Sequence, residues 1–209
     1  MPKQTFFNLP EERRNRIIEI AIDEFSVNSF MNASISKIAE TANVAKGSMY
    51  QYFENKKDLY KYTLEIAALK KQEYLLDCLQ NLEHTYFIDI IKDLYVKGLT
   101  FASENPKLAG IANNFMKETD IKFKEEIMGR SIDKSNQFFE ILIDKAKEKG
   151  EINPLIDTRM GAHIITSLNT SILDYLLSYM TYEEVLQNQN ELLSNVNKML
   201  FVIENGFKK

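Results

Sequence analysis

Residues 35–53 read Ile-Ser-Lys-Ile-Ala-Glu-Thr-Ala-Asn-Val-Ala-Lys-Gly-Ser-Met-Tyr-Gln-Tyr-Phe, and they predict two short helices joined by a tight turn. Apolar residues recur at helical spacing across residues 35–42, so the first helix should have one buried stripe. Ser34 can cap its free N–H groups, and Asn43 suits the left-handed backbone of a turn residue. The second helix should begin near Lys46. Two short helices joined in this way form a helix-turn-helix.

The second helix carries polar groups on the side that faces away from the first helix. Met49 and Phe53 are one turn apart and should lie on its inner side. The remaining cationic and hydroxyl side chains suit a DNA groove, where they can bond to phosphates and base edges. The candidates for this contact are Lys46, Ser48, Tyr50 and Tyr52.

Residues 34–59 resemble the DNA-binding signature of TetR-type transcriptional regulators. The family's second helix reads Thr/Ser-hydrophobic-x-x-Ile-Ala, and residues 34–39 read Ser-Ile-Ser-Lys-Ile-Ala. Its turn and recognition helix read Gly-Val-Ser-Lys-Gly-Thr-hydrophobic-Tyr-x-His/Tyr-Phe-x-x-Lys-x-x-Leu. Residues 43–59 read Asn-Val-Ala-Lys-Gly-Ser-Met-Tyr-Gln-Tyr-Phe-Glu-Asn-Lys-Lys-Asp-Leu, and Ala45 lacks the side chain that would cap the recognition helix.

The resemblance adds three residues to the expected DNA interface. It implies that Ser34 and Gly47 belong to the interface and that Lys56 contacts the DNA backbone. The alternative is a helical hairpin without a nucleic-acid partner. The net charge of −4 for the chain does not exclude DNA, because binding depends on a local basic surface. Residues 1–62 hold nine Lys and Arg against eight Asp and Glu, which gives +1 and permits the interface.

Composition predicts a mostly helical chain, and the resemblance to TetR-type regulators implies an all-α fold with two parts. The chain of 209 residues has only seven Gly and four Pro, which leaves little room for turn-rich β architecture. We expect a three-helix DNA-binding unit over residues 1–55 and a larger helical effector-binding and dimerisation domain over residues 56–209. Residues 1–9 should form a loose arm, and Arg13, Arg14 and Arg16 should either touch phosphates or form a solvated charged face. A helix from Lys56 to about residue 82 should connect the two parts.

The last two helices are apolar on a broad face, which is typical of a helix bundle. Packing within one chain is one interpretation of this pattern. TetR-like proteins pair through their last two long helices as a four-helix bundle, so the resemblance implies a homodimer. The residues expected at its interface are Leu168, Ile172, Leu192, Leu193, Val196, Leu200 and Ile203.

Aromatic residues and a few polar ones in the middle and later helices could line an apolar cavity. The resemblance implies an effector pocket, which would take a small apolar or aromatic molecule. For any single one of these residues, a place in the ordinary core is the favoured interpretation. The candidates are Phe101, Phe115, Met116, Phe138, His163, Asn169 and Tyr175.

Catalytic signatures are absent from the sequence, which has no Gly-rich phosphate loop, no Cys/His metal spacing and no Gly-x-Ser-x-Gly. We therefore expect no enzyme activity, cofactor or metal. The single Cys78 lies in an apolar context, which predicts a buried structural thiol. No signal peptide and no membrane-spanning run of apolar residues is present, so a cytoplasmic protein without a membrane partner is expected.

These observations favour a sequence-specific DNA-binding transcriptional regulator. We expect a repressor that a small apolar or aromatic effector releases from a palindromic duplex operator. The alternative is a TetR-like DNA-binding protein that is controlled by a protein partner or is constitutive. A ligand among the middle helices should tilt the helix that begins at Lys56, so that ligand and operator oppose each other.

Overall fold

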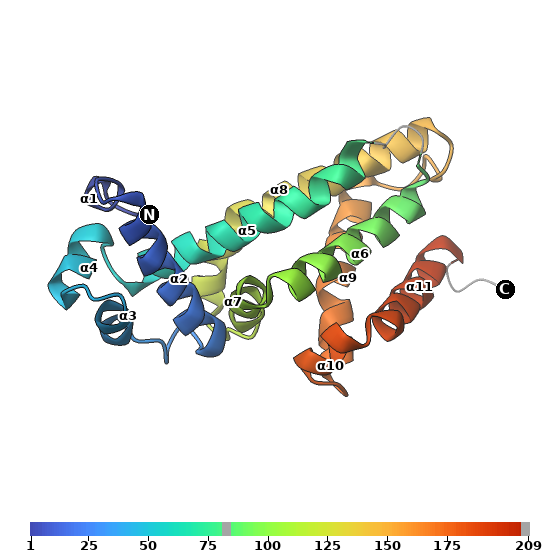
Figure 1. Cartoon of the computed structure of the whole chain (residues 1–209). Coiled ribbons are helices and arrows are strands. Elements are labelled where there is room, and N and C mark those ends of the chain that lie inside the picture. The colour runs from blue at the N-terminus through green and yellow to red at the C-terminus, as the bar shows by residue number, and fades with distance from the viewer. Residues whose placement is uncertain (81–84, 206–209) are drawn as a thin grey trace. The chain divides into compact units, whose positions relative to one another are not determined.

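The computed structural model describes residues 1–80 and 85–205, and over these ranges the chain is helical without strands. The expected all-α fold is confirmed (Figure 1). No helix within these ranges combines the length and apolar character that a membrane span needs. The helices are α1 (Gln4–Phe7), α2 (Glu11–Val27), α3 (Ile35–Thr41), α4 (Lys46–Tyr52), α5 (Lys56–Gln80), α6 (Phe87–Glu104), α7 (Pro106–Met116), α8 (Ile121–Glu148), α9 (Thr158–Leu177), α10 (Tyr182–Gln187) and α11 (Gln189–Asn205).

The chain divides into two compact units, and each combines segments that are far apart in sequence. Unit 1 comprises Met1–Glu73 and Glu104–Ile127, whereas unit 2 comprises Tyr74–Ser103 and Met128–Lys209. The expected division after residue 55 falls inside unit 1, which also takes in α7 and the start of α8. That division stays a prediction about where DNA binding and effector binding reside.

The core of unit 1 is an aromatic cluster centred on Tyr60, which is almost fully buried. Its ring centroid lies 4.8 Å from that of Phe25 in α2 and 6.1 Å from that of Phe123 in α8. Phe30, from the loop after α2, stacks on Phe123 with centroids 4.6 Å apart. Phe115 of α7 completes the cluster. Side chains from α2, α5, α7 and α8 therefore share one core.

Polar contacts fasten α7 to the end of α2. Nδ2 of Asn114 donates hydrogen bonds to the carbonyl oxygens of Phe25 and Ser26, at 3.0 and 2.9 Å. These carbonyls are near the C-terminus of α2, where intrahelical donors run out. Gly110 permits the close approach, because a Cβ there would lie 3.2 Å from the Ser26 carbonyl oxygen. Helix α7 is thus held against the helix that leads into the helix-turn-helix.

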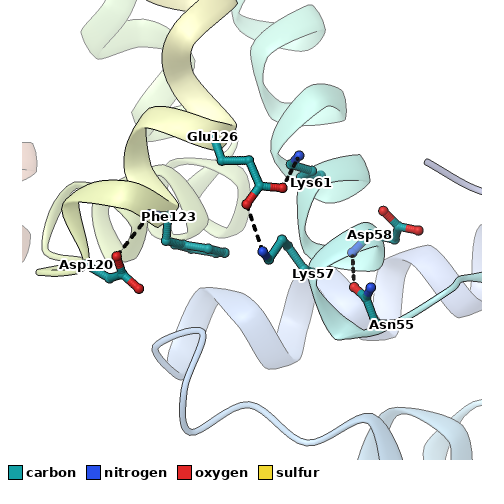
Figure 2. Close-up of polar contacts among 7 residues, drawn as sticks. All are labelled: Asn55, Lys57, Asp58, Lys61, Asp120, Phe123 and Glu126. Atoms are coloured by element: carbon teal, nitrogen blue, oxygen red, sulfur yellow. Dashed lines mark hydrogen bonds and ion pairs between the residues drawn. The ribbon is translucent and has the colours of Figure 1, made fainter.

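The start of α8 is tied to α5 by one carboxylate and two lysines. Figure 2 shows Glu126 of α8 reaching between Lys57 and Lys61, with Oε2 2.8 Å from the Lys57 ammonium and Oε1 3.2 Å from that of Lys61. Hydrogen bonds from Lys57 and then Lys61 lower the pKa of the Glu126 carboxyl group. The Lys57 ammonium also lies 5.7 Å from the centroid of the Phe123 ring. Two cations close to the helix-turn-helix are therefore paired within unit 1.

Unit 2 has its own apolar core, formed by side chains of α6, α8, α9, α10 and α11. Two side chains cap its later helices: Asp157 accepts a hydrogen bond from the Met160 backbone N–H at the start of α9, and Thr181 forms a capping box with Glu184 at α10. Cys78 is buried, as expected, and burial together with the Asp93 carboxylate raises the pKa of its thiol to about 11. This thiol is therefore poorly suited to act as a nucleophile at neutral pH.

Candidate nucleic-acid interface

The helix-turn-helix forms as the sequence predicts. Helices α3 and α4 are joined through Asn43, which has a φ of 56°. Asn tolerates this left-handed backbone better than most residues, so it can replace the glycine of the family signature. The Ser34 side chain accepts a hydrogen bond from the Lys37 backbone N–H at 3.3 Å and thereby caps α3. Ser34 is thus a structural cap, and its contact with DNA stays a prediction.

Helix α4 has one buried face and one open face. Met49 and Phe53 are buried against the rest of unit 1, as expected from their spacing. On the other face Lys46 is exposed, Ser48 is half-buried, and Tyr50 keeps 46% of its surface exposed. These three side chains are available for a groove. Exposed Gly47 and Gln51 also belong to this open face.

Tyr52 differs from the expectation. It is only 8% exposed, and its ring lies 6.2 Å from that of Phe6 in α1. The sequence predicts its hydroxyl group in a DNA groove, because the spacing of Met49 and Phe53 indicates that these two residues form the inner face of the helix. In the structure the ring packs in the core of unit 1 instead, so Tyr52 supports the helix from behind.

Gly47 has no packing role among residues 1–80 and 85–205. A Cβ at this position would have open space around it, with no other atom within 4 Å beyond its own helix backbone and its chain neighbours. Glycine in a helix costs about 0.5–1 kcal/mol relative to alanine. Intramolecular packing therefore does not account for a glycine here, whereas the close approach of an external surface would.

Lys56 also differs from the expectation. Its ammonium donates hydrogen bonds to the carbonyl oxygens of Met31 and Ala33, at 3.1 and 3.0 Å. It lies 4.7 Å from the centroid of the Phe30 ring, and burial lowers its pKa from the usual value. The signature lysine thus holds the loop between α2 and α3. The family resemblance located the residue but did not reveal these internal acceptors.

Glu24 is a structural residue that the sequence argument missed. It is only 7% exposed, and Oε1 accepts a hydrogen bond from the Ser34 backbone N–H at 3.1 Å. Oε2 lies 2.7 Å from the Lys37 ammonium. The carboxylate therefore fixes the start of α3 from α2. Its place beside Phe25 on the buried stripe of α2 was the available signal, because an unpaired carboxylate is costly to bury.

The N-terminal segment is helical and packed against the rest of unit 1, so the expected loose arm is a wrong prediction. Residues Gln4–Phe7 form α1, and Phe6 is only 1% exposed. The Arg14 guanidinium donates to the carbonyl oxygens of Phe7 and Leu9, both at 2.8 Å. Arg14 therefore neither touches phosphate nor stands freely in solvent in this structure. It holds the end of α1 from α2.

The predicted effector residues are divided between the two units. Phe115 and Met116 belong to unit 1, where Phe115 is part of the aromatic core. Phe101 and Phe138 belong to unit 2, and Phe101 is buried beside Tyr74. His163 and Tyr175 are exposed on α9, and the side chain of Asn169 lies outside the described residues. Aromatic character alone did not distinguish cavity from core.

Unit 2 contains a different apolar pocket, with a volume of about 970 Å³. Its walls come from the start of α6, the end of α8, the following loop, the start of α9 and the end of α11. Isoleucine dominates the lining, while charged groups lie among it from α6, the loop and α11. The apolar residues of the lining are Phe87, Ile88, Ile143, Ile152, Ile156, Ile164, Ile165 and Ile203.

The predicted dimer residues fall into two groups. Ile172, Leu192, Val196 and Leu200 are buried in the core of unit 2 within a single chain, so they are unavailable to a partner in this conformation. Leu168 and Leu193 are half-buried. Ile203 is 36% exposed and has the exposed neighbours Phe201 and Val202 on α11.

Three comparisons place this geometry among known proteins. The family model described as "Bacterial regulatory proteins, tetR family" matches residues 17–63, which include α3 and α4. The probable acrEF/envCD operon repressor of Escherichia coli strain K12 is 25% identical over 198 residues, which cover 92% of this chain and 88% of that protein.

Two solved structures share the fold over nearly the whole chain. A TetR family transcriptional regulator from Chloroflexus aurantiacus J-10-FL superposes with a TM-score of 0.67 at 27% identity, covering 99% of this chain and 98% of that one. FadR from Bacillus subtilis, in complex with stearoyl-CoA, has a TM-score of 0.69 at 18% identity, with 93% and 99% covered. The second likeness concerns the fold alone.

Proposed function

We propose that this chain, which belongs to the TetR family of bacterial transcriptional regulators, is a repressor released from its operator by a small apolar effector. As a member of that family it is a DNA-binding transcriptional regulator. The finer parts of the proposal are repression, a palindromic operator, a homodimer and the effector itself. We assign it no enzymatic role.

The open face of α4 carries the proposal for DNA. Lys46 and Tyr50 are exposed on a helix whose opposite face, at Met49, is buried. A cation and a phenol hydroxyl group suit phosphates and base edges in a major groove. The open space at Gly47 supports a close approach of the DNA backbone. We propose α4 as the recognition helix on these grounds.

A homodimer would present two such helices to one duplex. In helix-turn-helix dimers the two half-sites are about one helical turn, roughly 34–36 Å, or a multiple of it apart, which makes the operator palindromic. The proposed dimer surface is the exposed face of α11 around Phe201 together with exposed side chains of α9, including Tyr175. This revises the predicted set, in which several residues are buried within one chain.

The proposed effector site is the isoleucine-rich pocket of unit 2. Its volume of about 970 Å³ lies within the range of drug-sized sites, which is roughly 300–1,000 Å³. The lining carries Lys92 and Lys149 but also Asp89, Glu151 and Glu204, so a strongly anionic ligand gains no net charge attraction. A regulator of the same fold, FadR from Bacillus subtilis, is described with stearoyl-CoA, and only the acyl chain of that ligand is apolar, whereas its coenzyme A part is strongly anionic. This likeness therefore supports only an acyl-chain-like, apolar component of the effector. Control by a protein partner, or no control, is the alternative.

A paired glycine substitution tests the DNA proposal. Gly47→Ala should stabilise the protein by up to about 1 kcal/mol, because alanine is the better helix former. The same change should weaken binding to an operator duplex about tenfold or more, equivalent to ~1.4 kcal/mol, because the added methyl group occupies the space reserved for DNA. Thermal unfolding and fluorescence anisotropy measure the two effects.

Gly98→Ala is the matched control. Gly98 lies in α6 of unit 2, and a Cβ there would likewise have no atom within 4 Å. This variant should gain similar stability and keep the affinity of the wild type for the duplex. The duplex can be obtained by selecting a random-sequence pool on the wild-type chain. Equal affinity of both alanine variants and the wild type would contradict the assignment of α4 as the recognition helix.

A further inference from the structure

We infer that the N-terminal segment Lys3–Phe7 is a clamp that positions the recognition helix by capping its C-terminal end. The inference rests on the proposed function, because it concerns how α4 is held ready for DNA. The segment is called the arm clamp below. It acts through hydrogen bonds to backbone atoms of α4, so its residues are positioning residues.

Helix α4 needs support from outside. It has only seven residues, and its N-cap residue Ala45 makes no side-chain capping bond. Isolated helices shorter than about 12–15 residues are marginal in water. A helix also leaves its last four carbonyl groups without intrahelical partners. The order of α4 therefore depends on its neighbours at both ends and along its buried face.

The arm clamp supplies the missing donors at the C-terminal end. The Lys3 backbone N–H donates to the Tyr52 carbonyl oxygen at 2.8 Å, and the Lys3 ammonium donates to that of Tyr50 at 3.0 Å. The Thr5 hydroxyl group donates to the Gln51 carbonyl oxygen. The Phe53 backbone N–H satisfies the remaining carbonyl, that of residue 49. The last four carbonyl groups of α4 thus all accept a hydrogen bond, three of them from the arm clamp.

Electrostatics favour the same arrangement. The C-terminus of a helix carries a partial negative charge, and a lysine near it both bonds the last carbonyls and stabilises that charge. Lys3 and Tyr50 are both exposed, so their bond competes with water. Bonds of this kind hold their geometry only if the segment that carries them is fixed by other contacts.

Phe6 provides that fixed point. It is buried, and its ring centroid lies 5.0 Å from that of Phe53, which directly follows α4, and 6.0 Å from that of Tyr62 in α5. On the other side Arg14 of α2 holds the carbonyl groups of Phe7 and Leu9. The arm clamp is therefore anchored between two helices while it caps a third.

Losing a clamp bond and losing a direct DNA contact should affect operator binding in different ways. Loss of a clamp bond should loosen α4 in the free protein and lower affinity, because the lost order must be restored on binding. The number of phosphate contacts would stay the same. Loss of a phosphate contact should instead reduce the slope of log K against log salt by about 0.9.

Thr5→Val tests the clamp, with Thr5→Ser as the matched control. Valine has nearly the shape of threonine but lacks the hydroxyl donor, whereas serine keeps the donor. Hydrogen exchange of the α4 backbone amides should be about twofold to tenfold faster in Thr5→Val, the equivalent of one ordinary hydrogen bond. Affinity for a duplex selected from a random pool by the wild type should fall by a similar factor at unchanged salt slope. Thr5→Ser should match the wild type in both measurements.

Two further variants separate the remaining interpretations. Phe6→Ala should accelerate exchange in α4 more than Thr5→Val does, and leave exchange in α9 unchanged. Lys3→Met tests whether Lys3 contacts a phosphate instead. If this variant reduces the slope of log K against log salt by about 0.9 and leaves hydrogen exchange of the α4 amides as in the wild type, the clamp is overturned. Unchanged exchange of α4 in Thr5→Val would also overturn it. If the wild type selects no duplex, the proposed function fails, whereas the exchange comparison still decides the clamp.

Discussion

At the scale of single residues, two lysines of one signature have different environments. Lys46 is exposed on the open face of α4, whereas the Lys56 ammonium is bonded to the carbonyl oxygens of Met31 and Ala33. A sequence motif records only that both are lysines. The environment separates a side chain that is available to DNA from one that organises the loop before α3.

The two lysines should therefore respond differently to the same substitution. Lys46→Met should reduce the slope of log K against log salt by about 0.9 and leave the melting temperature unchanged. Lys56→Met should lower the free energy of unfolding by about 1–3 kcal/mol, because two carbonyl groups lose their donor, and keep the salt slope of the wild type. Titration with duplex at several salt concentrations and thermal unfolding supply the measurements. If Lys56→Met is as stable as the wild type and has a reduced slope of log K against log salt, Lys56 contacts the DNA backbone, as the resemblance implies.

Local rules succeeded where a residue acts on its own backbone. The cap at Ser34, the left-handed Asn43 and the inner position of Met49 follow from spacing and intrinsic preference, and all three occur in the structure. The rules did not predict the roles of Glu24 and Lys56. Their partners lie 10 to 25 residues away, so folding alone brings them together.

At the scale of elements, α11 shows why a broad apolar face is ambiguous. Leu192, Val196 and Leu200 pack inside unit 2, and the exposed Phe201 follows directly after them. Hydrophobic periodicity predicts that side chains are buried, but it does not indicate whether the same chain or a partner buries them. The sequence therefore predicted the helix and its apolar character, and the structure assigned its two sides.

Glutamate substitutions at two neighbouring residues of α11 should have different effects, one on dimerisation and the other on folding. Phe201→Glu should give a folded monomer with weakened operator binding, because the charge lies on the proposed dimer face, where the phenylalanine is 62% exposed within one chain. Leu200→Glu should unfold unit 2, since an unpaired charge would be buried in its core. Sedimentation velocity and circular dichroism distinguish these outcomes. A Phe201→Glu protein that stays dimeric would move the interface elsewhere.

At the scale of the whole molecule, the expected tilt of the helix that begins at Lys56 involves more than one helix. Helix α5 begins in unit 1 and ends in unit 2, and its expected end at residue 82 lies outside the described residues. Asn114 fastens α7 to α2, and Glu126 fastens the start of α8 to α5. We therefore expect a ligand in the proposed effector pocket to move α7 and the start of α8 together with α5. The proposed opposition of ligand and operator stays a prediction.

A tryptophan in the pocket should remove the coupling between ligand binding and operator binding. Ile156→Trp should fill part of the pocket and abolish release by compounds that displace the wild type from its selected duplex. The coupling lost should be about 1–3 kcal/mol, the usual size for such linked sites. Leu155→Trp is the control, because Leu155 is 90% exposed and is not part of the pocket lining. Compounds that act equally on both variants and on the wild type would place the effector site elsewhere.

The discontinuous make-up of unit 1 has a consequence for how the protein is made and recombined. Its two segments, Met1–Glu73 and Glu104–Ile127, are separated by 30 residues that belong to unit 2. During synthesis on the ribosome, the helix-turn-helix therefore emerges long before the helices that complete its core. A chimaera that transfers DNA specificity to another regulator must carry both segments. Transplanting residues 1–55 alone would leave Phe25 without the ring of Tyr60 in α5, and Phe30 without the rings of Tyr60 and of Phe123 in α8.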